Sequence, residues 1–222
     1  MSFLSRVEID YQKRESLLQL NCVDAFHNWV ERCFPTECQA SLRSRKLWRL
    51  DTLNGHHYLL MVSEEKPRLD CMEKFGVPGS ASIKDYDPFL QSLSNGQRMQ
   101  FRVTLNPVVS IANREDSSRK RGAVKPHVTV EQQKQFLLNR AQPEHNSGFI
   151  VSPDECTIVE RGYSYFRKPQ KDDHHRPIRL SRVTYQGILT INDVNLLRKT
   201  LTCGIGKKKA YGFGMLTVIP CK

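Results

Sequence analysis

Apolar residues recur along the chain at spacings that predict an alternating series of strands and helices. Within residues 17–33 they follow i, i+3, i+4 steps, which predicts one amphipathic helix that ends before Pro35. Asn54-Gly55 is a strong hairpin-turn signal, and the apolar runs 46–50 and 57–63 flank it. The same criteria predict strands at 3–10, 81–86, 97–106, 149–152, 157–167, 179–191 and 213–219, and helices at 67–75, 129–140 and 193–203.

Two of these helices have recognisable end signals. Thr129 is expected to be an N-cap, with Glu131 and Gln132 close to the capping-box position. For the helix at 193–203, Asn192 or Asp193 is the expected cap and Gly204 the expected stop.

The predicted elements follow the order β-α-β-β-α-β, and this order occurs approximately twice along the chain. This order predicts an α+β protein with two tandem ferredoxin-like domains, the βαββαβ topology that RNA-recognition (RRM-like) domains also use. We expect the first domain at residues 1–95 and the second at residues 96–222.

Charge and cysteine content narrow the class of protein. The 222 residues carry a net charge of +11, which favours a polyanionic partner, with nucleic acid ahead of an acidic protein or a membrane surface. No apolar run approaches the roughly 20 residues of a spanning helix, and the N-terminus lacks signal-peptide features, so we expect a cytoplasmic protein. The seven scattered cysteines, with no CxxC pair, indicate free thiols and no metal site.

The most informative segment is the glycine-rich stretch 204–214, GIGKKKAYGFG, between a predicted helix and a predicted strand. Glycines allow backbone amides to approach a phosphate, and lysines add positive charge. The segment is not a Walker loop, because G-x-x-x-x-G-K-S/T is absent and the order is helix, loop, strand. From the residues alone, a tight turn beside the sheet explains the glycines equally well.

Together with the upstream stretch 187–193, GILTIND, this segment resembles the CasE family of CRISPR RNA-processing endoribonucleases, which belong to the RAMP superfamily. The family loop has the form G-x-G-x-x-K-A/S-x-G-x-G. The resemblance extends to an opening strand, to His27 ahead of Phe34-Pro35, and to the segment 101–107, FRVTLNP. It spans most of the chain and is weakest over about 65–95 and 110–178.

The resemblance implies two ferredoxin-like domains and metal-independent cleavage of a CRISPR repeat RNA hairpin at its 3′ base. The products would carry a 5′-hydroxyl and a 2′,3′-cyclic phosphate, and the mature RNA would stay bound within the Cascade complex. The implied partners are the repeat hairpin and other Cascade subunits, with no cofactor and no membrane.

Attack by a ribose 2′-hydroxyl needs a proton acceptor, a proton donor and charge stabilisation. His27 occupies the family's histidine position and suits either proton role, and Lys209 matches the lysine of the loop. Family members often carry a tyrosine one turn before the histidine, where this chain has Asp24; Tyr211 is an alternative source of a hydroxyl. Without the resemblance, His27 would be an ordinary helix residue beside Phe26.

Basic residues interleaved with aromatic ones mark the predicted hairpin at 157–191, and its phosphate contacts would recognise an RNA stem. A solvated strand face is the alternative. A second basic cluster lies at 114–125 and a third at 43–49. The residues expected to bind RNA are Gly204, Gly206, Lys207, Lys208, Tyr211, Gly212, Gly214, Arg161, Arg167, Lys168 and Arg179.

Two other functions remain open at this point. The chain would be a catalytically silent RNA-binding subunit if Asp24 marks a lost activity. It would be a basic scaffold protein if its charges serve assembly with partner subunits.

Overall fold

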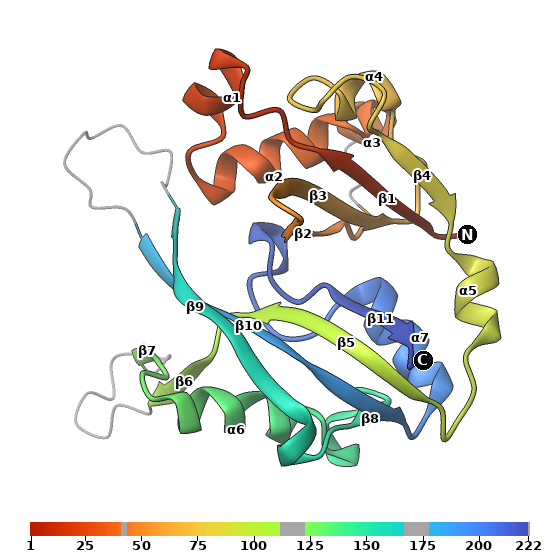
Figure 1. The fold of residues 1–222 in the computed structure, drawn as a ribbon, viewed down its shortest axis with the longest axis vertical. Helices are drawn as coiled ribbons and strands as arrows, with labels where there is room; N and C mark the ends of the chain where they lie inside the picture. Colours follow the sequence, from red (N-terminus) through yellow and green to blue (C-terminus); the bar gives the residue numbers. More distant parts are fainter. Residues whose placement is uncertain (41–43, 112–122, 167–177, 222) are drawn as a thin grey trace.

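The computed structural model describes residues 1–40, 44–111, 123–166 and 178–221 (Figure 1). They form two larger antiparallel sheets with helices on their outer faces, one from each half of the chain, and a small two-stranded sheet of Val108–Ile111 and Ala123–Pro126. Figure 1 shows the two larger sheets lying between α2 (Val23–Arg32) and α6 (Val130–Arg140). No helix in these ranges is long and apolar enough to span a membrane.

The first sheet has the strand order β2-β3-β1-β4, with every neighbouring pair antiparallel. This is the strand order of a ferredoxin-like fold, in which the first and third strands are central. α5 (Asp87–Ser92) then leads to the second sheet. The elements of the first half are β1 (Phe3–Glu8), α1 (Arg14–Gln19), α2 (Val23–Arg32), α3 (Pro35–Ala40), β2 (Leu47–Leu53), β3 (His56–Ser63), α4 (Leu69–Met72) and β4 (Ser82–Asp85).

The second sheet has the order β11-β5-β10-β8, and β9 pairs with β10 in a long ribbon. It repeats the arrangement of the first sheet, so the expected α+β class with two ferredoxin-like units is confirmed. Its elements are β5 (Arg98–Leu105), β6 (Val108–Ile111), β7 (Ala123–Pro126), α6 (Val130–Arg140), η1 (Pro143–His145), β8 (Phe149–Ile150), η2 (Pro153–Glu155), β9 (Cys156–Phe166), β10 (Ile178–Ile191), α7 (Val194–Cys203), η3 (Lys209–Tyr211) and β11 (Leu216–Pro220).

The single helix expected at 17–33 is wrong, because α1 and α2 are separate. Asn21 donates a side-chain hydrogen bond to the Leu18 carbonyl at 3.1 Å, which competes with continuation of the helix. Leu18, expected on the apolar face of the single helix, is exposed, and the next helix starts after Cys22. Pro35 also begins α3 rather than only ending the preceding helix.

Both predicted helix caps are confirmed. Thr129 and Gln132 form the capping box of α6, and the Asp193 carboxylate accepts from the amides of Asn195 and Leu196 at the start of α7. The last strand starts at Leu216 instead of residue 213.

One buried arginine connects the two halves. Arg49, on β2, donates from Nη1 to the carbonyls of Arg102 and Met215 at 2.8 Å, and its Nη2 donates to Thr217 at 2.9 Å. Its charge is compensated by Asp51, at 2.7 Å. Because these partners lie on β5 and β11 or next to them, Arg49 holds the first sheet against the second.

Candidate active site

The glycine-rich segment 204–214 forms a loop that leaves α7 and packs against β2. Its ends are joined, because the Ile205 amide donates to the Gly214 carbonyl at 2.9 Å. Near its middle, the Trp48 indole Nε1 donates to the Ala210 carbonyl at 3.1 Å. The loop belongs to the second half in sequence but lies at the junction of the two halves (Figure 1).

The loop geometry requires glycine. A Cβ on Gly212 would lie 2.7 Å from the Trp48 ring, and one on Gly214 would lie 2.2 Å from the Ile205 carbonyl oxygen. These contacts support the tight-turn explanation of the glycines, and their approach to an RNA phosphate stays a prediction. Positive φ angles, from +74° to +84°, occur at Gly204, Gly206, Gly212 and Gly214.

The loop brings an aromatic side chain against His27. The rings of His27 on α2 and Tyr211 on η3 have centroids 6.0 Å apart, and Phe166 of β9 lies 4.6 Å from the same Tyr211 ring. The His27 side chain is 26% exposed, so a substrate can reach it. Three segments that are distant in sequence therefore meet at this histidine.

A partly buried charge cluster lies beside His27. The Glu31 carboxylate has one oxygen 3.9 Å from His27 Nδ1 and the other 3.7 Å from Lys46 Nζ. Lys46 is 2% exposed and also bonds Glu37 at 2.5 Å. Burial alone would raise the pKa of Glu37, but hydrogen bonds from Lys46 and Ser44 outweigh it and hold the pKa below its usual range.

The three loop lysines lie in different surroundings. Lys209 Nζ donates to the Cys203 carbonyl at 2.8 Å, at the end of α7. Partial burial, and then the charge of Arg45, lowers the pKa of Lys209. Lys207 and Lys208 are exposed, and Lys208 Nζ lies 5.8 Å from the centre of the Tyr211 ring.

Asp24 occupies the first turn of α2 and is partly buried. The structure therefore has no tyrosine at the position where the family often has one. Tyr211 provides a tyrosine ring beside His27 from another element, as considered from the sequence.

The basic residues of the β9–β10 ribbon differ in their contacts. Arg161 is exposed and bonds Gln133 and the Val128 carbonyl near the start of α6. Arg179 lies over the Tyr163 ring at 3.9 Å. The predicted RNA-binding residues Arg167 and Lys168 lie outside the described residues, as does most of the basic cluster at 114–125.

Some residues of the basic patches are not on the surface. Lys46 and Arg49, from the cluster at 43–49, are buried in ion pairs. They are therefore not surface residues, and they do not extend an RNA-binding surface. Tyr185 of the predicted hairpin is also buried, and its hydroxyl donates to the Gln133 carbonyl at 2.7 Å.

Sequence reasoning missed Glu31 and Lys46 as neighbours of His27. The i, i+4 spacing of His27 and Glu31 could have indicated the first contact. Lys46 had no local signal, because the fold alone brings the start of β2 under α2.

Within the described ranges, no three His, Cys, Asp or Glu side chains converge as a metal site would require.

Comparison with known proteins assigns the chain to a family. A sequence model described as "CRISPR associated protein" matches residues 2–220. The CRISPR-associated endoribonuclease Cse3 of Thermus thermophilus is 28% identical over 186 residues, covering 80% of this chain and 81% of the relative.

Solved structures share the fold. Thermus thermophilus Cse3 bound to an RNA representing a pre-cleavage complex matches with a TM-score of 0.76 and 21% identity, covering 99% of both chains. A chain of a CRISPR RNA-guided surveillance complex matches with a TM-score of 0.66 and 21% identity, covering 99% of this chain and 100% of that one. The resemblance found in the glycine-rich loop is thus confirmed, and the chain belongs to this family of CRISPR-associated proteins.

Proposed function

We propose that the protein is an endoribonuclease that cleaves CRISPR repeat RNA hairpins and retains the mature RNA. The observation that carries the proposal is the meeting of His27 with Tyr211 and the lysine-bearing glycine loop. A Cse3 relative named as an endoribonuclease, and a similar fold bound to RNA, support the substrate class. Similarity to a chain of a surveillance complex supports the other Cascade subunits as partners.

In the proposed reaction, the ribose 2′-oxygen attacks the adjacent phosphorus as the bond from phosphorus to the 5′-oxygen breaks. A base removes the 2′-hydroxyl proton and an acid protonates the leaving 5′-oxygen, giving a 2′,3′-cyclic phosphate and a 5′-hydroxyl. His27 carries one of these protons. Lys209 stabilises the phosphorane charge, and the reaction proceeds without metal.

We further propose that residues 1–95 form the domain with the catalytic histidine and residues 96–222 the domain with the basic ribbon and loop. The RNA stem lies on the ribbon and the loop, where rigid phosphates meet a fixed set of basic groups. The proposed RNA contacts are Gly204, Gly206, Lys207, Lys208, Tyr211, Gly212, Gly214, Arg161, Arg167, Lys168 and Arg179.

The test is single-turnover cleavage of a repeat hairpin by the His27→Ala protein. We expect the rate to fall by roughly 10²–10⁴-fold, the usual range for a positioned acid or base, with hairpin binding nearly unchanged. His145→Ala is the matched control, because His145 is exposed on η1 and should leave the rate unchanged.

Two further experiments test whether cleavage needs a metal ion and whether it needs the 2′-hydroxyl as nucleophile. A chelator should not slow the parent protein, and a 2′-deoxy nucleotide just upstream of the cut should block cleavage while permitting binding. Undiminished cleavage by His27→Ala would remove the residue from the mechanism, and cleavage of the deoxy substrate would refute the mechanism.

Asp24, in place of the family's tyrosine, favours one second candidate, a silent RNA-binding subunit. Tight hairpin binding by the parent protein without any cleavage would support that function. A protein that binds no RNA hairpin and still joins partner subunits would be a scaffold.

A further inference from the structure

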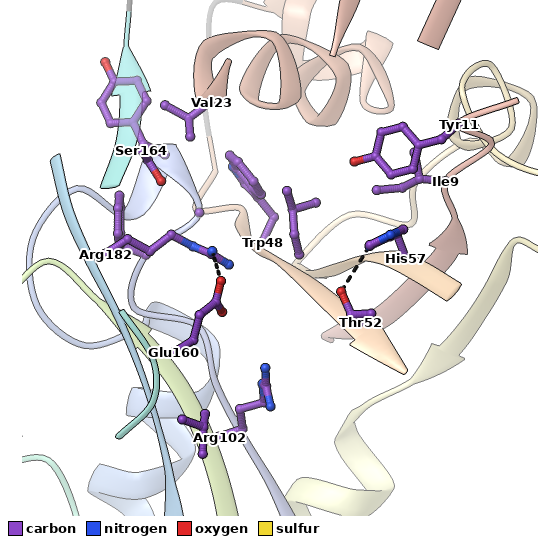
Figure 2. Close-up of a pocket in the computed structure, with 15 residues that line it drawn as sticks. Ile9, Tyr11, Val23, Trp48, Thr52, His57, Arg102, Glu160, Ser164 and Arg182 are labelled. Atoms are coloured by element: carbon purple, nitrogen blue, oxygen red, sulfur yellow. Dashed lines mark hydrogen bonds and ion pairs between the residues drawn. The ribbon is translucent and has the colours of Figure 1, made fainter. Parts of the chain in front are cut away.

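Figure 2 shows a cleft of about 470 Å³, and its lining includes Tyr211, whose ring neighbours His27. Val23, one helical turn before His27 on α2, lines the cleft together with Tyr211 and Gly212 of the loop. The volume falls within the roughly 300–1,000 Å³ of small-ligand sites. The cleft therefore adjoins the proposed active site through Tyr211 and is large enough for a ligand.

One wall of the cleft is aromatic. The rings of Tyr11 and His57 meet edge to face, with centroids 5.2 Å apart, and Thr52 Oγ1 lies 3.0 Å from His57 Nδ1. Burial raises the pKa of Tyr11, so its hydroxyl stays protonated and able to donate. Figure 2 shows these side chains on one side of the cleft, with Trp48 between them and the opposite wall.

The opposite wall carries two guanidinium groups. Arg182 pairs with Glu160 at 2.5 Å, and Arg102 lies 3.4 Å from Asp51. Arg102 Nε is buried and has no hydrogen-bond partner among the described residues. In Figure 2 both arginines extend from the second sheet toward the cleft.

From these two walls we infer that the cleft binds one unpaired nucleotide that flanks the stem of the RNA hairpin. The base packs against Tyr11 and His57, because an aromatic ring provides a stacking face for any base. The phosphate lies toward Arg102 and Arg182, whose guanidinium groups match phosphate oxygens. A base inside the stem is covered on both faces by its neighbours, whereas an unpaired nucleotide beyond the stem end can reach into the cleft and present its face to this wall.

This inference rests on the proposed function and adds a subsite to it. Because Tyr211 lines the cleft and contacts His27, a nucleotide held there fixes the adjoining phosphate beside the proposed proton carrier. The flanking nucleotide is located either 5′ or 3′ of the stem, and both have the same chemistry.

The experiment measures affinities for hairpins made uncleavable by a 2′-deoxy nucleotide. One hairpin is blunt, one has a single unpaired 5′ nucleotide, one a single unpaired 3′ nucleotide, and matched versions carry an abasic residue there. We expect one of the extended hairpins to bind the parent protein about tenfold tighter than the blunt one, and the abasic version to lose that gain. The extension that gives the gain identifies the flank.

His57→Ala should reduce the gain to less than about twofold. Tyr11→Ala is a second variant of the same wall, in case one of them folds poorly. The matched control is His56→Ala, because His56 is adjacent on the same hairpin, bonds Glu8 at 2.6 Å and does not line the cleft. This control should keep the full gain.

Equal affinity of the parent protein for blunt and extended hairpins, or a gain that survives both variants, would overturn the subsite. Failure of the proposed function gives a different result, because it appears as absence of cleavage of the ribose hairpins. The two outcomes are therefore measured on separate substrates.

Discussion

At the scale of single residues, the Glu31 carboxylate lies between an imidazole and a buried ammonium. Its oxygens are 3.9 Å from His27 and 3.7 Å from Lys46, and Lys46 is also bonded to Glu37. Lysine is rarely so buried without paired charges, and two carboxylates with one lysine leave an excess of negative charge. The Glu31 carboxylate that faces the proposed proton carrier is held there by a buried ion pair.

A Lys209 variant distinguishes two roles for this lysine, stabilisation of the phosphorane charge and binding of the RNA. If it stabilises the phosphorane, Lys209→Ala slows single-turnover cleavage by about 10²–10³-fold and changes hairpin affinity much less. Lys199→Ala, which removes an exposed lysine of α7 outside the proposed RNA contacts, is the matched control and should affect neither rate nor affinity much. Equal losses of rate and affinity in Lys209→Ala would make it a binding residue only.

The same lysine has an expected pH signature. Partial burial, and then the Arg45 charge, lowers the pKa of Lys209, so its ammonium loses the proton at a lower pH than an ordinary lysine does. The rate advantage of the parent protein over Lys209→Ala should therefore shrink as the pH rises into the alkaline range. An advantage that stays constant up to the ordinary lysine pKa would contradict this assignment.

At the scale of elements, local signals predicted what local chemistry decides. The Asn54-Gly55 turn and the Thr129 capping box are confirmed, because their hydrogen bonds and φ angles depend on a few adjacent residues. The helix at 17–33 failed because the side chain of Asn21 bonds the backbone of the preceding turn. The strand expected from residue 213 starts late because Gly214 has φ +84°, which a strand does not accommodate.

The loop glycines offer a matched pair of substitutions. Gly206 and Gly214 both have positive φ, but a Cβ on Gly206 would meet only Leu105, at 3.6 Å. Gly206→Ala should cost about 1–2 kcal/mol in free energy of unfolding, from backbone strain alone. Gly214→Ala should cost more and abolish cleavage, because its Cβ would meet the Ile205 carbonyl oxygen. Urea unfolding of both variants checks this, and equal losses of stability would contradict it.

At the scale of the whole molecule, the net charge of +11 predicts how RNA binding depends on salt. Each neutralised phosphate releases counterions, so about six phosphate contacts would lower the affinity roughly 10³-fold between about 50 and 200 mM salt. The protein should also prefer a repeat hairpin to an unstructured RNA of equal length. Titrations at several salt concentrations measure both, and a flat salt response would contradict the electrostatic part.

The candidate site was only partly predictable from the sequence, because some of its contacts join elements that are distant in sequence. The loop composition and the resemblance indicated His27, Lys209 and Tyr211, which are now found on elements that meet at one junction. The burial of Arg49 depends on how the two sheets face each other, and that of Lys46 depends on how α2 and α3 pack over the start of β2. Nothing within a few residues of either position encodes that packing.

The joining of His27 with Tyr211 also sets when activity can arise during synthesis. Tyr211 follows His27 by more than 180 positions, so the ribosome adds it on the order of ten seconds or more later. Until then the histidine helix lacks the loop that completes the proposed site. A nascent chain whose first sheet has already folded would therefore remain unable to cut RNA, and nuclease activity would begin only once both sheets are in place.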